Sequence, residues 1–85
     1  MNKKLFDLEF QYQFYLNKVG LKEELMPKSQ RIETKRAFMS GCYQILATQY
    51  EMAKDESLSE NDQVELLNSL LEQSDAYWEN EINNG

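Results

Sequence analysis

Four basic side chains lie close together in a chain that is acidic overall. Lys28, Arg31, Lys35 and Arg36 fall between residues 27 and 50, where Glu33 is the only acid, whereas the 85-residue chain has a formal net charge of −6. The first three follow i, i+3, i+7 spacing and line one face of a helix, with Arg36 one position round. Arginine offers phosphate a planar fork and lysine a point charge. These four residues are the predicted ligand-binding site, for an anion.

A purely structural interpretation of the same residues stays open. Basic residues at helical spacing often form a solvated face, and nearby acids such as Glu23 and Glu24 could neutralise them. Residues 51–85 carry ten acidic side chains and one basic one, which gives a second source of neutralising charge. That acidic segment could instead bind a basic surface of another protein.

Catalysis and metal binding lack their usual residues. The chain has no histidine and one cysteine, Cys42. A zinc site needs several Cys or His ligands, and a thiol without an activating histidine is expected to be a small packing residue. We therefore expect no catalytic residue, no metal site, no cofactor and no enzymatic activity. The net acidity argues against binding to a nucleic-acid backbone, which needs many basic contacts.

The N-terminal sequence does not resemble an export signal. The run from Leu5 to Leu16 is interrupted by polar residues, and no apolar stretch approaches the roughly 20 residues of a membrane-spanning helix. Together with the free thiol, this predicts a reducing, cytoplasmic setting without membrane contact.

Helical spacing dominates the first segment, which we expect to be a helix from about Lys3 to Val19. Its apolar face comprises Leu5, Leu8, Tyr12, Tyr15, Leu16 and Val19. A competing strand-like alternation is formed by Phe6, Leu8, Phe10, Tyr12 and Phe14. The length of the segment and the stop at Val19-Gly20 favour the helix.

Two longer helices are expected after the first. One begins near Pro27, which suits the first helical position, and ends at about Lys54. Its apolar face comprises Ile32, Met39, Cys42, Leu46, Tyr50 and Ala53, widened by Phe38, Ile45 and Met52. After a break at 55–59, Ser59 and Asp62 resemble a capping box. The last helix runs to about Ile82 and is expected to bury Val64, Leu67, Leu71, Trp78 and Ile82, with Leu70 and Tyr77 beside them.

These elements predict an all-α fold: residues 1–85 form a single helical domain, a small three-helix bundle with a long central helix. Phe6, Phe10 and Phe14 lie off the main stripe of the first helix, and a second apolar face usually has a second partner. We therefore expect a homo-oligomer whose interface includes these three residues. Gly41 indicates close helix packing, a bend in the long helix, or an opening for a ligand.

The segment from roughly Tyr12 to Tyr50 resembles a group of small tailed-bacteriophage proteins of uncharacterised function. The likeness is carried by Tyr15, Leu16, Gly20 and Leu21, followed by a Met-Pro-x-x-Gln-x-x-Glu-x-Lys-Arg-Ala-Phe-x-x-Gly motif from Met26 to Gly41. In layout alone, the chain also resembles phage anti-CBASS sponges, which are short helical oligomers that trap cyclic nucleotides of host immune signalling. That second resemblance carries no ligand-binding residue to a matched position here.

Together, the charges and the resemblances predict a phage-encoded anti-defence protein in the host cytoplasm. Its function would be to oligomerise and sequester a small phosphorylated ligand such as a cyclic nucleotide. The alternatives are an acidic inhibitor that binds a host protein, of the anti-restriction or anti-CRISPR type, and a minor structural protein of the virion.

Overall fold

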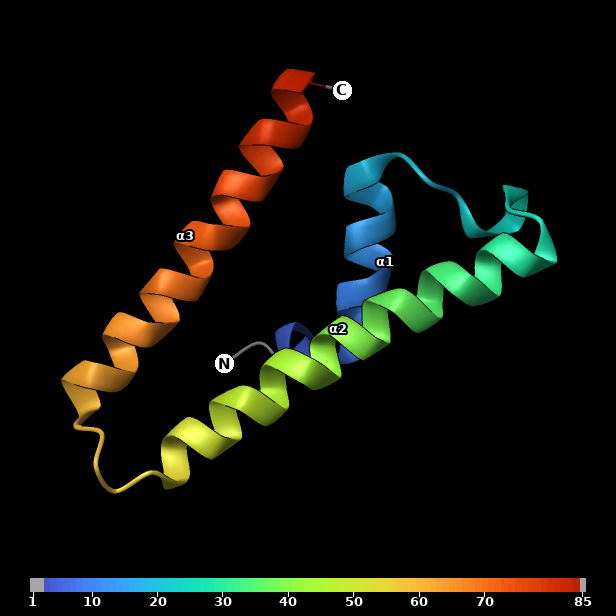
Figure 1. The fold of residues 1–85 in the computed structure, drawn as a ribbon. Helices are drawn as coiled ribbons and strands as arrows, with labels where there is room; N and C mark the ends of the chain where they lie inside the picture. Colours follow the sequence, from blue (N-terminus) through green and yellow to red (C-terminus); the bar gives the residue numbers. More distant parts are fainter. Residues whose placement is uncertain (1–2, 85) are drawn as a thin grey trace. The chain divides into compact units, whose positions relative to one another are not determined.

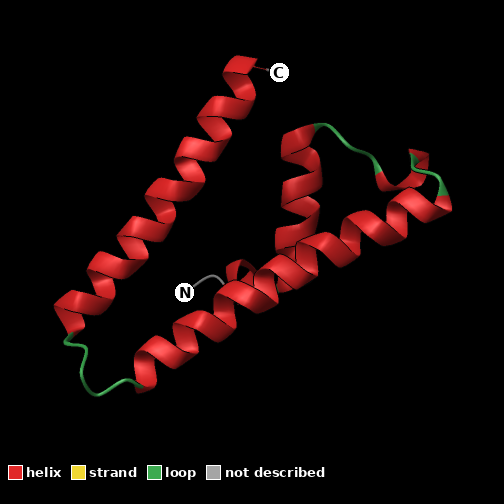
Figure 2. Cartoon of the chain, in the orientation of Figure 1, coloured by secondary structure: helices red, strands yellow, loops and turns green. Residues whose placement is uncertain are grey.

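The computed structural model describes residues 3–84, and every regular element within that range is helical (Figures 1 and 2). A short 3₁₀-helix η1 (Lys3–Phe6) precedes α1 (Leu8–Val19). A second 3₁₀-helix, η2 (Glu23–Leu25), leads into the long α2 (Lys28–Lys54), and α3 (Glu60–Asn84) completes the chain. The predicted all-α fold with three principal helices is confirmed. The alternating aromatic residues between Phe6 and Phe14 do not form a strand.

The first helix is shorter at its start than the sequence predicts. A continuous helix from Lys3 was expected, but Asp7 adopts an extended conformation between η1 and α1. Its carboxylate accepts a hydrogen bond from the backbone N–H of Glu9 at 3.2 Å. Aspartate is a favoured N-cap because it satisfies an N–H that the helix leaves unbonded. The apolar spacing continues through Asp7, but the cap at this residue divides residues 3–19 into η1 and α1.

The end of α1 is the glycine stop that the sequence predicts. Gly20 has φ 76° and ψ 24°, which is the left-handed region. The next residue, Leu21, donates its backbone N–H to the carbonyl oxygen of Leu16 at 2.9 Å. This bond gives a carbonyl group in the last turn of α1 a hydrogen-bond partner, and the chain turns away from the helix axis at this point.

The long α2 begins immediately after Pro27. Arg31 donates its backbone N–H to the carbonyl oxygen of Pro27 at 2.9 Å, which makes Pro27 the N-cap and Lys28 the first helical residue. Pro27 was expected to suit the first helical position, and it lies one residue before that position. α2 spans 27 residues, or roughly 40 Å at about 1.5 Å per residue.

Between α2 and α3, local side-chain hydrogen bonds fix the predicted break. Asp55 accepts hydrogen bonds from the backbone N–H and the hydroxyl of Ser57, at 2.9 and 2.6 Å, and these bonds lower the pKa of Asp55. Asp62 donates its N–H to the Ser59 hydroxyl at 3.1 Å, and its carboxylate accepts the Ser59 N–H at 3.0 Å. The reciprocal capping box at the start of α3 is confirmed.

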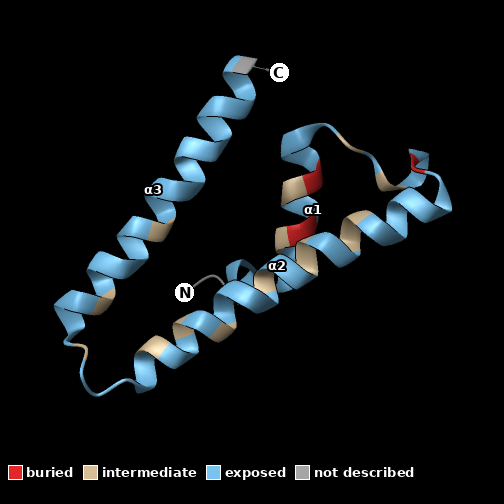
Figure 3. Ribbon diagram, in the orientation of Figure 1, coloured by how far each residue is buried: buried red, intermediate tan, exposed pale blue. Residues whose placement is uncertain are grey.

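The chain divides into two compact units, residues 1–47 and 48–85, with the boundary inside α2. In the first unit, α1 lies against the first part of α2 (Figure 1). The buried core is small: Tyr12 is 0% exposed, and Leu16 and Met26 are nearly as deep (Figure 3). The half-buried side chains of Tyr15, Leu21, Phe38 and Met39 pack around these three.

Aromatic packing joins α1 to α2. The ring of Phe38 on α2 lies 5.3 Å from that of Tyr12 and 5.4 Å from that of Tyr15, measured between centroids. Both distances are in the range for favourable tilted ring pairs. Tyr12 and Leu16 are one helical turn apart, so the core face of α1 is a single short stripe.

Much of the apolar surface that the sequence places in a core is exposed. On the first segment, Leu5, Leu8 and Val19 are exposed, although their spacing matches that of Tyr12 and Leu16. On α3 the expected core residues are also exposed: Val64, Leu67, Leu71, Trp78 and Ile82, together with Tyr77. Leu70 alone of the named α3 residues is half-buried. The apolar faces of the helices are thus only partly covered within each of the two units.

Gly41 does not mark a close approach within the described chain. A Cβ built at this position meets no heavy atom within 4 Å, apart from its own helical backbone and neighbours. Tight packing at Gly41, the preferred interpretation, therefore has no contact to support it among the described residues of the first unit, and otherwise stays a prediction. α2 continues through the glycine as helix.

The two glycines give opposite predictions for substitution by alanine. Gly20→Ala should lower the free energy of unfolding by about 1–2 kcal/mol, because an L-residue is strained in the left-handed region. Gly41→Ala should raise it by about 1 kcal/mol, because alanine favours helix and the site has space. Urea unfolding followed by circular dichroism measures both, each substitution serving as the control for the other. A loss of stability in Gly41→Ala would show that a partner contacts this position.

Candidate anion-binding site at the start of α2

The four basic residues of the predicted site lie on the first nine residues of α2. Lys28, Arg31 and Arg36 are exposed, whereas Lys35 is half-buried beside α1. Helical spacing places Lys28, Arg31 and Lys35 along one side of α2, with Arg36 round the helix from them. The structure therefore separates the set into three accessible cations and one that contacts the core unit.

Lys35 is engaged by two groups of α1. Its ammonium nitrogen lies 2.9 Å from a carboxylate oxygen of Glu9. The same nitrogen lies 5.5 Å from the centroid of the Tyr12 ring, within the range of a cation–π contact. Both partners come from α1, so Lys35 helps to hold that helix against α2.

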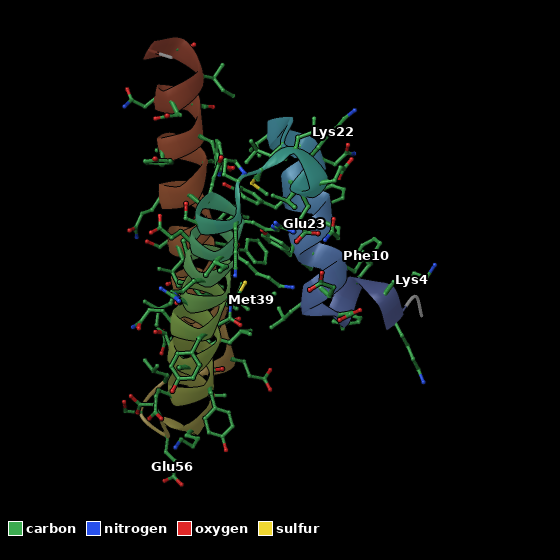
Figure 4. All side chains as sticks on the ribbon, turned by 90° about the vertical axis from the view of Figure 1, so that its right-hand side faces the viewer. Lys4, Phe10, Lys22, Glu23, Met39 and Glu56 are labelled. Carbon is green, nitrogen blue, oxygen red and sulfur yellow. The ribbon has the colours of Figure 1, made fainter. Side chains whose placement is uncertain are left out.

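The Glu9 carboxylate is part of a small polar network along α1. The Gln13 amide donates hydrogen bonds to Glu9 at 3.2 Å and to Glu23 at 3.3 Å. Glu23, at the start of η2, lies beside α1 (Figure 4). Lys35 thus faces carboxylates from two parts of the chain, and its charge is partly neutralised.

Proton affinities at this ion pair shift in the direction that strengthens it. The hydrogen bond from Lys35 lowers the pKa of Glu9, and the hydrogen bond from Gln13 acts in the same direction. The bond to Glu9 raises the pKa of Lys35. Both groups remain accessible to water, so solvent screens their attraction.

The hydroxyl of Tyr12 is buried without a hydrogen-bond partner in the described chain. Burial raises the pKa of Tyr12, and the negative charge of Glu23 adds to this effect. An unsatisfied buried hydroxyl costs about 1–3 kcal/mol. The ring of Tyr12 therefore stabilises the core while its hydroxyl opposes it.

Lys28, Arg31 and Arg36 have no ion-pair partner among residues 3–83. Lys28 and Arg31 lie in the first turn of α2, where the first N–H groups have no intrahelical acceptor and the helix dipole is positive, whereas Arg36 lies roughly two turns further along. Exposed cations beside such N–H groups suit an anion with several oxygens, above all a phosphate. The accessible part of the predicted site is therefore Lys28, Arg31 and Arg36, with Lys35 behind it.

The predicted oligomer interface is exposed in this chain. Phe6 is 73%, Phe14 59% and Phe10 37% exposed. Phe10 points away from α2, on the outer side of α1 (Figure 4). Phe6 belongs to η1 and precedes the Asp7 cap, so the three aromatic residues do not share one continuous helix. Their role as a subunit contact remains a prediction.

The partner of Lys35 is the residue that sequence analysis missed. Glu23 and Glu24 were considered as neutralising acids because they are near in sequence, whereas Glu9 is distant. Its position beside Tyr12 on the core stripe, at i and i+3, was the available signal. Cys42, which was expected to be a small packing residue, is a free, half-buried thiol on α2.

Other searches of the described residues and of known proteins gave negative results. Within residues 3–84, no group of three or more His, Cys, Asp or Glu side chains is placed to hold a metal ion. No helix in that range has both the length and the apolar character needed to cross a membrane. No protein-family model, curated protein or solved structure matches the chain.

The Glu9–Lys35 pair predicts a specific acid dependence of stability. Because the pKa of Glu9 is lowered on folding, its contribution is present above its ordinary value of 4.5 and is lost as pH falls through the folded value. Glu9→Gln should therefore unfold at a lower temperature than the parent at pH 7, and the difference should shrink below about pH 4.5. Thermal unfolding between pH 3 and 7 measures this. Glu24→Gln, which removes an exposed acid, should not reproduce it; equal curves for Glu9→Gln and the parent would contradict the assignment.

Proposed function

We propose that this protein is a non-enzymatic binding protein that assembles from several copies and sequesters a small phosphorylated ligand, such as a cyclic nucleotide. The observation that carries the proposal is the set of three exposed cations at the start of α2, Lys28, Arg31 and Arg36. They lack ion-pair partners within residues 3–83 although the chain has more acidic than basic side chains. Like charges next to a positive helix end oppose folding, and a bound anion removes that cost.

The small core supports assembly. An 85-residue chain buries a limited part of its surface, and here only Tyr12, Leu16 and Met26 are fully buried among the described side chains. Exposed aromatic and aliphatic side chains extend over η1, α1, α2 and α3. Exposed apolar faces of this extent are typical of association surfaces.

The resemblance to small tailed-phage proteins supports a phage context, in which the proposed role is directed against host defence. Sequestration needs a binding site and an abundant protein, and it needs no catalytic group. The chain's lack of histidine suits such a role. The ligand class is set by the chemistry of the site, which favours compact phosphates over long nucleic-acid backbones.

Arg31 is the residue with which to test ligand binding, because it is exposed and outside the Glu9–Lys35 pair. A thermal-shift screen against cyclic nucleotides and inorganic phosphate should find a ligand that raises the unfolding temperature. Arg31→Ala should then weaken binding by about 1.5–3 kcal/mol, the range for a hydrogen bond to a charged group, with the fold unchanged. Calorimetric titration at two salt concentrations measures the loss.

Lys18→Ala is the matched control, since it removes an exposed cation near the end of α1. It should leave affinity nearly unchanged. Equal losses of affinity in Lys18→Ala and Arg31→Ala would indicate that the ligand is attracted by basic side chains anywhere on the protein and has no specific site at Arg31. A parent that binds no phosphorylated compound in these titrations would overturn the proposed function.

The aromatic contact makes a separate prediction. Light scattering at micromolar concentration should give the parent the mass of several chains, and Phe10→Ser with Phe14→Ser should lower that mass, because both side chains leave water on association. Leu25→Ser, a comparable exposed apolar residue on η2, should not. An unchanged mass in the double phenylalanine variant would remove these residues from the interface.

A second candidate function is supported by the charge of α3. This helix carries seven acidic and no basic residues, and the acids are exposed. Such a surface suits a basic region of a host protein, as in an acidic anti-defence inhibitor. Removing acids from α3 would abolish that binding, whereas Arg31→Ala would not affect it.

A further inference from the structure

The ion pair of Glu9 and Lys35 adjoins the candidate anion site, because Lys35 belongs to both. Lys35 follows Arg31 by four positions on α2, so the two side chains are neighbours on one face of the helix, about 5–6 Å apart at Cβ. Arg31 is exposed and has no ion-pair partner within residues 3–83, whereas the ammonium nitrogen of Lys35 lies 2.9 Å from a carboxylate oxygen of Glu9. Glu9 thus gives Lys35 an anionic partner one helical turn from the place where the proposed ligand would bring another.

We propose that Glu9 is an internal competitor of the ligand, and that a bound phosphate replaces its carboxylate as the partner of Lys35; this rests on the proposed function, since it requires an anion at Arg31. In the free protein, the carboxylate holds Lys35 beside α1. In the bound protein, phosphate oxygens accept hydrogen bonds from Arg31 and Lys35 together. The exchange adds Lys35 to the three exposed cations of the site.

The surroundings of Lys35 allow this exchange. Its side chain is 43% exposed and that of Glu9 is 51% exposed, so an anion in solution can reach the pair. The second contact of Lys35 is with the ring of Tyr12, which carries no net charge and is compatible with either anionic partner. Because lysine has a flexible four-carbon stem, its ammonium group can move between the two partners while the helix stays unchanged.

Glu9 also keeps a hydrogen-bond partner after the exchange. One of its carboxylate oxygens contacts Lys35, and the other accepts a hydrogen bond from the Gln13 amide at 3.2 Å. Gln13 lies one turn further along the same helix, so this bond does not depend on α2. The carboxylate is also exposed, and water can therefore replace the ammonium group at little cost. The exchange leaves no buried, unpaired charge on either helix.

The competition gives stability and ligand affinity opposite dependences on Glu9. Its carboxylate stabilises the contact between α1 and α2, but it must release Lys35 before a phosphate can bind that side chain. By thermodynamic linkage, a phosphate that takes Lys35 from Glu9 also weakens the attachment of α1 to α2. A residue with a structural role alone would lower the stability when it is replaced and would leave the affinity unchanged.

Replacement of Glu9 by glutamine tests the competition. Glu9→Gln should bind inorganic phosphate roughly two- to fivefold more tightly than the parent, the factor that corresponds to a partly exposed ion pair, although its unfolding temperature falls. Titration followed by nuclear magnetic resonance of the backbone amides gives the dissociation constant and shows whether the phosphate binds at the start of α2. Glu33→Gln is the matched control, because it removes an equal charge from an exposed position on the opposite side of α2 from Arg31. It should leave the affinity nearly unchanged.

A second pair of variants separates competition for Lys35 from simple repulsion between Glu9 and the phosphate. When Lys35→Gln is already present, adding Glu9→Gln should no longer change the affinity, because no ammonium group is left to release. A gain of equal size in that background would assign the effect to repulsion and overturn the proposed competition. Equal phosphate affinities of the parent and Glu9→Gln would also overturn it, while the proposed function would stand. If neither protein binds phosphate at α2, the proposed function fails and the competition fails with it.

Discussion

The packing of Phe38 between Tyr12 and Tyr15 is the interaction on which the first unit depends. It joins α1 to α2, covers the short apolar stripe that ends at Leu16, and brings Lys35 to Glu9 on the adjoining surface. Without it, α1 would be a 12-residue helix, a length that is marginal alone in water.

Helix ends were the most predictable part of the fold, because each depends on a few adjacent residues. The left-handed Gly20 and the Ser59–Asp62 capping box follow from local chemistry alone. The break at Asp7 was missed because apolar spacing continues through it, and a capping aspartate competes with that pattern only locally. Burial was the least predictable quantity. Periodicity reports which face of a helix is apolar, and it does not report whether another element is available to cover that face.

The location of the candidate site was predictable from the sequence. Which of its four cations are exposed and which is paired was predictable only in part. Sequence spacing places four cations at the start of α2, and that position is set by Pro27. The difference between Lys35 and the other three depends on a contact with Glu9, which is far away in sequence and is brought close only by the aromatic packing. Its one signal in the sequence is the position of Glu9 three residues before Tyr12, on the core stripe of α1. The three exposed cations and the paired one therefore differ: the former are accessible to solvent, while the latter supports the fold.

The contacts that join α1 to α2 also bear on how fast the first unit forms. Residues 9 and 35, and residues 12 and 38, are each separated by 26 positions, so a single modest loop must close before the unit can assemble. Loop-closure entropy grows slowly with length, and helical chains dominated by local contacts fold in microseconds to milliseconds. The small core of the first unit, which comprises Tyr12, Leu16 and Met26, also means that little buried surface opposes its opening. The first unit is accordingly expected to form early and, because only three of its described side chains are fully buried, to reopen often.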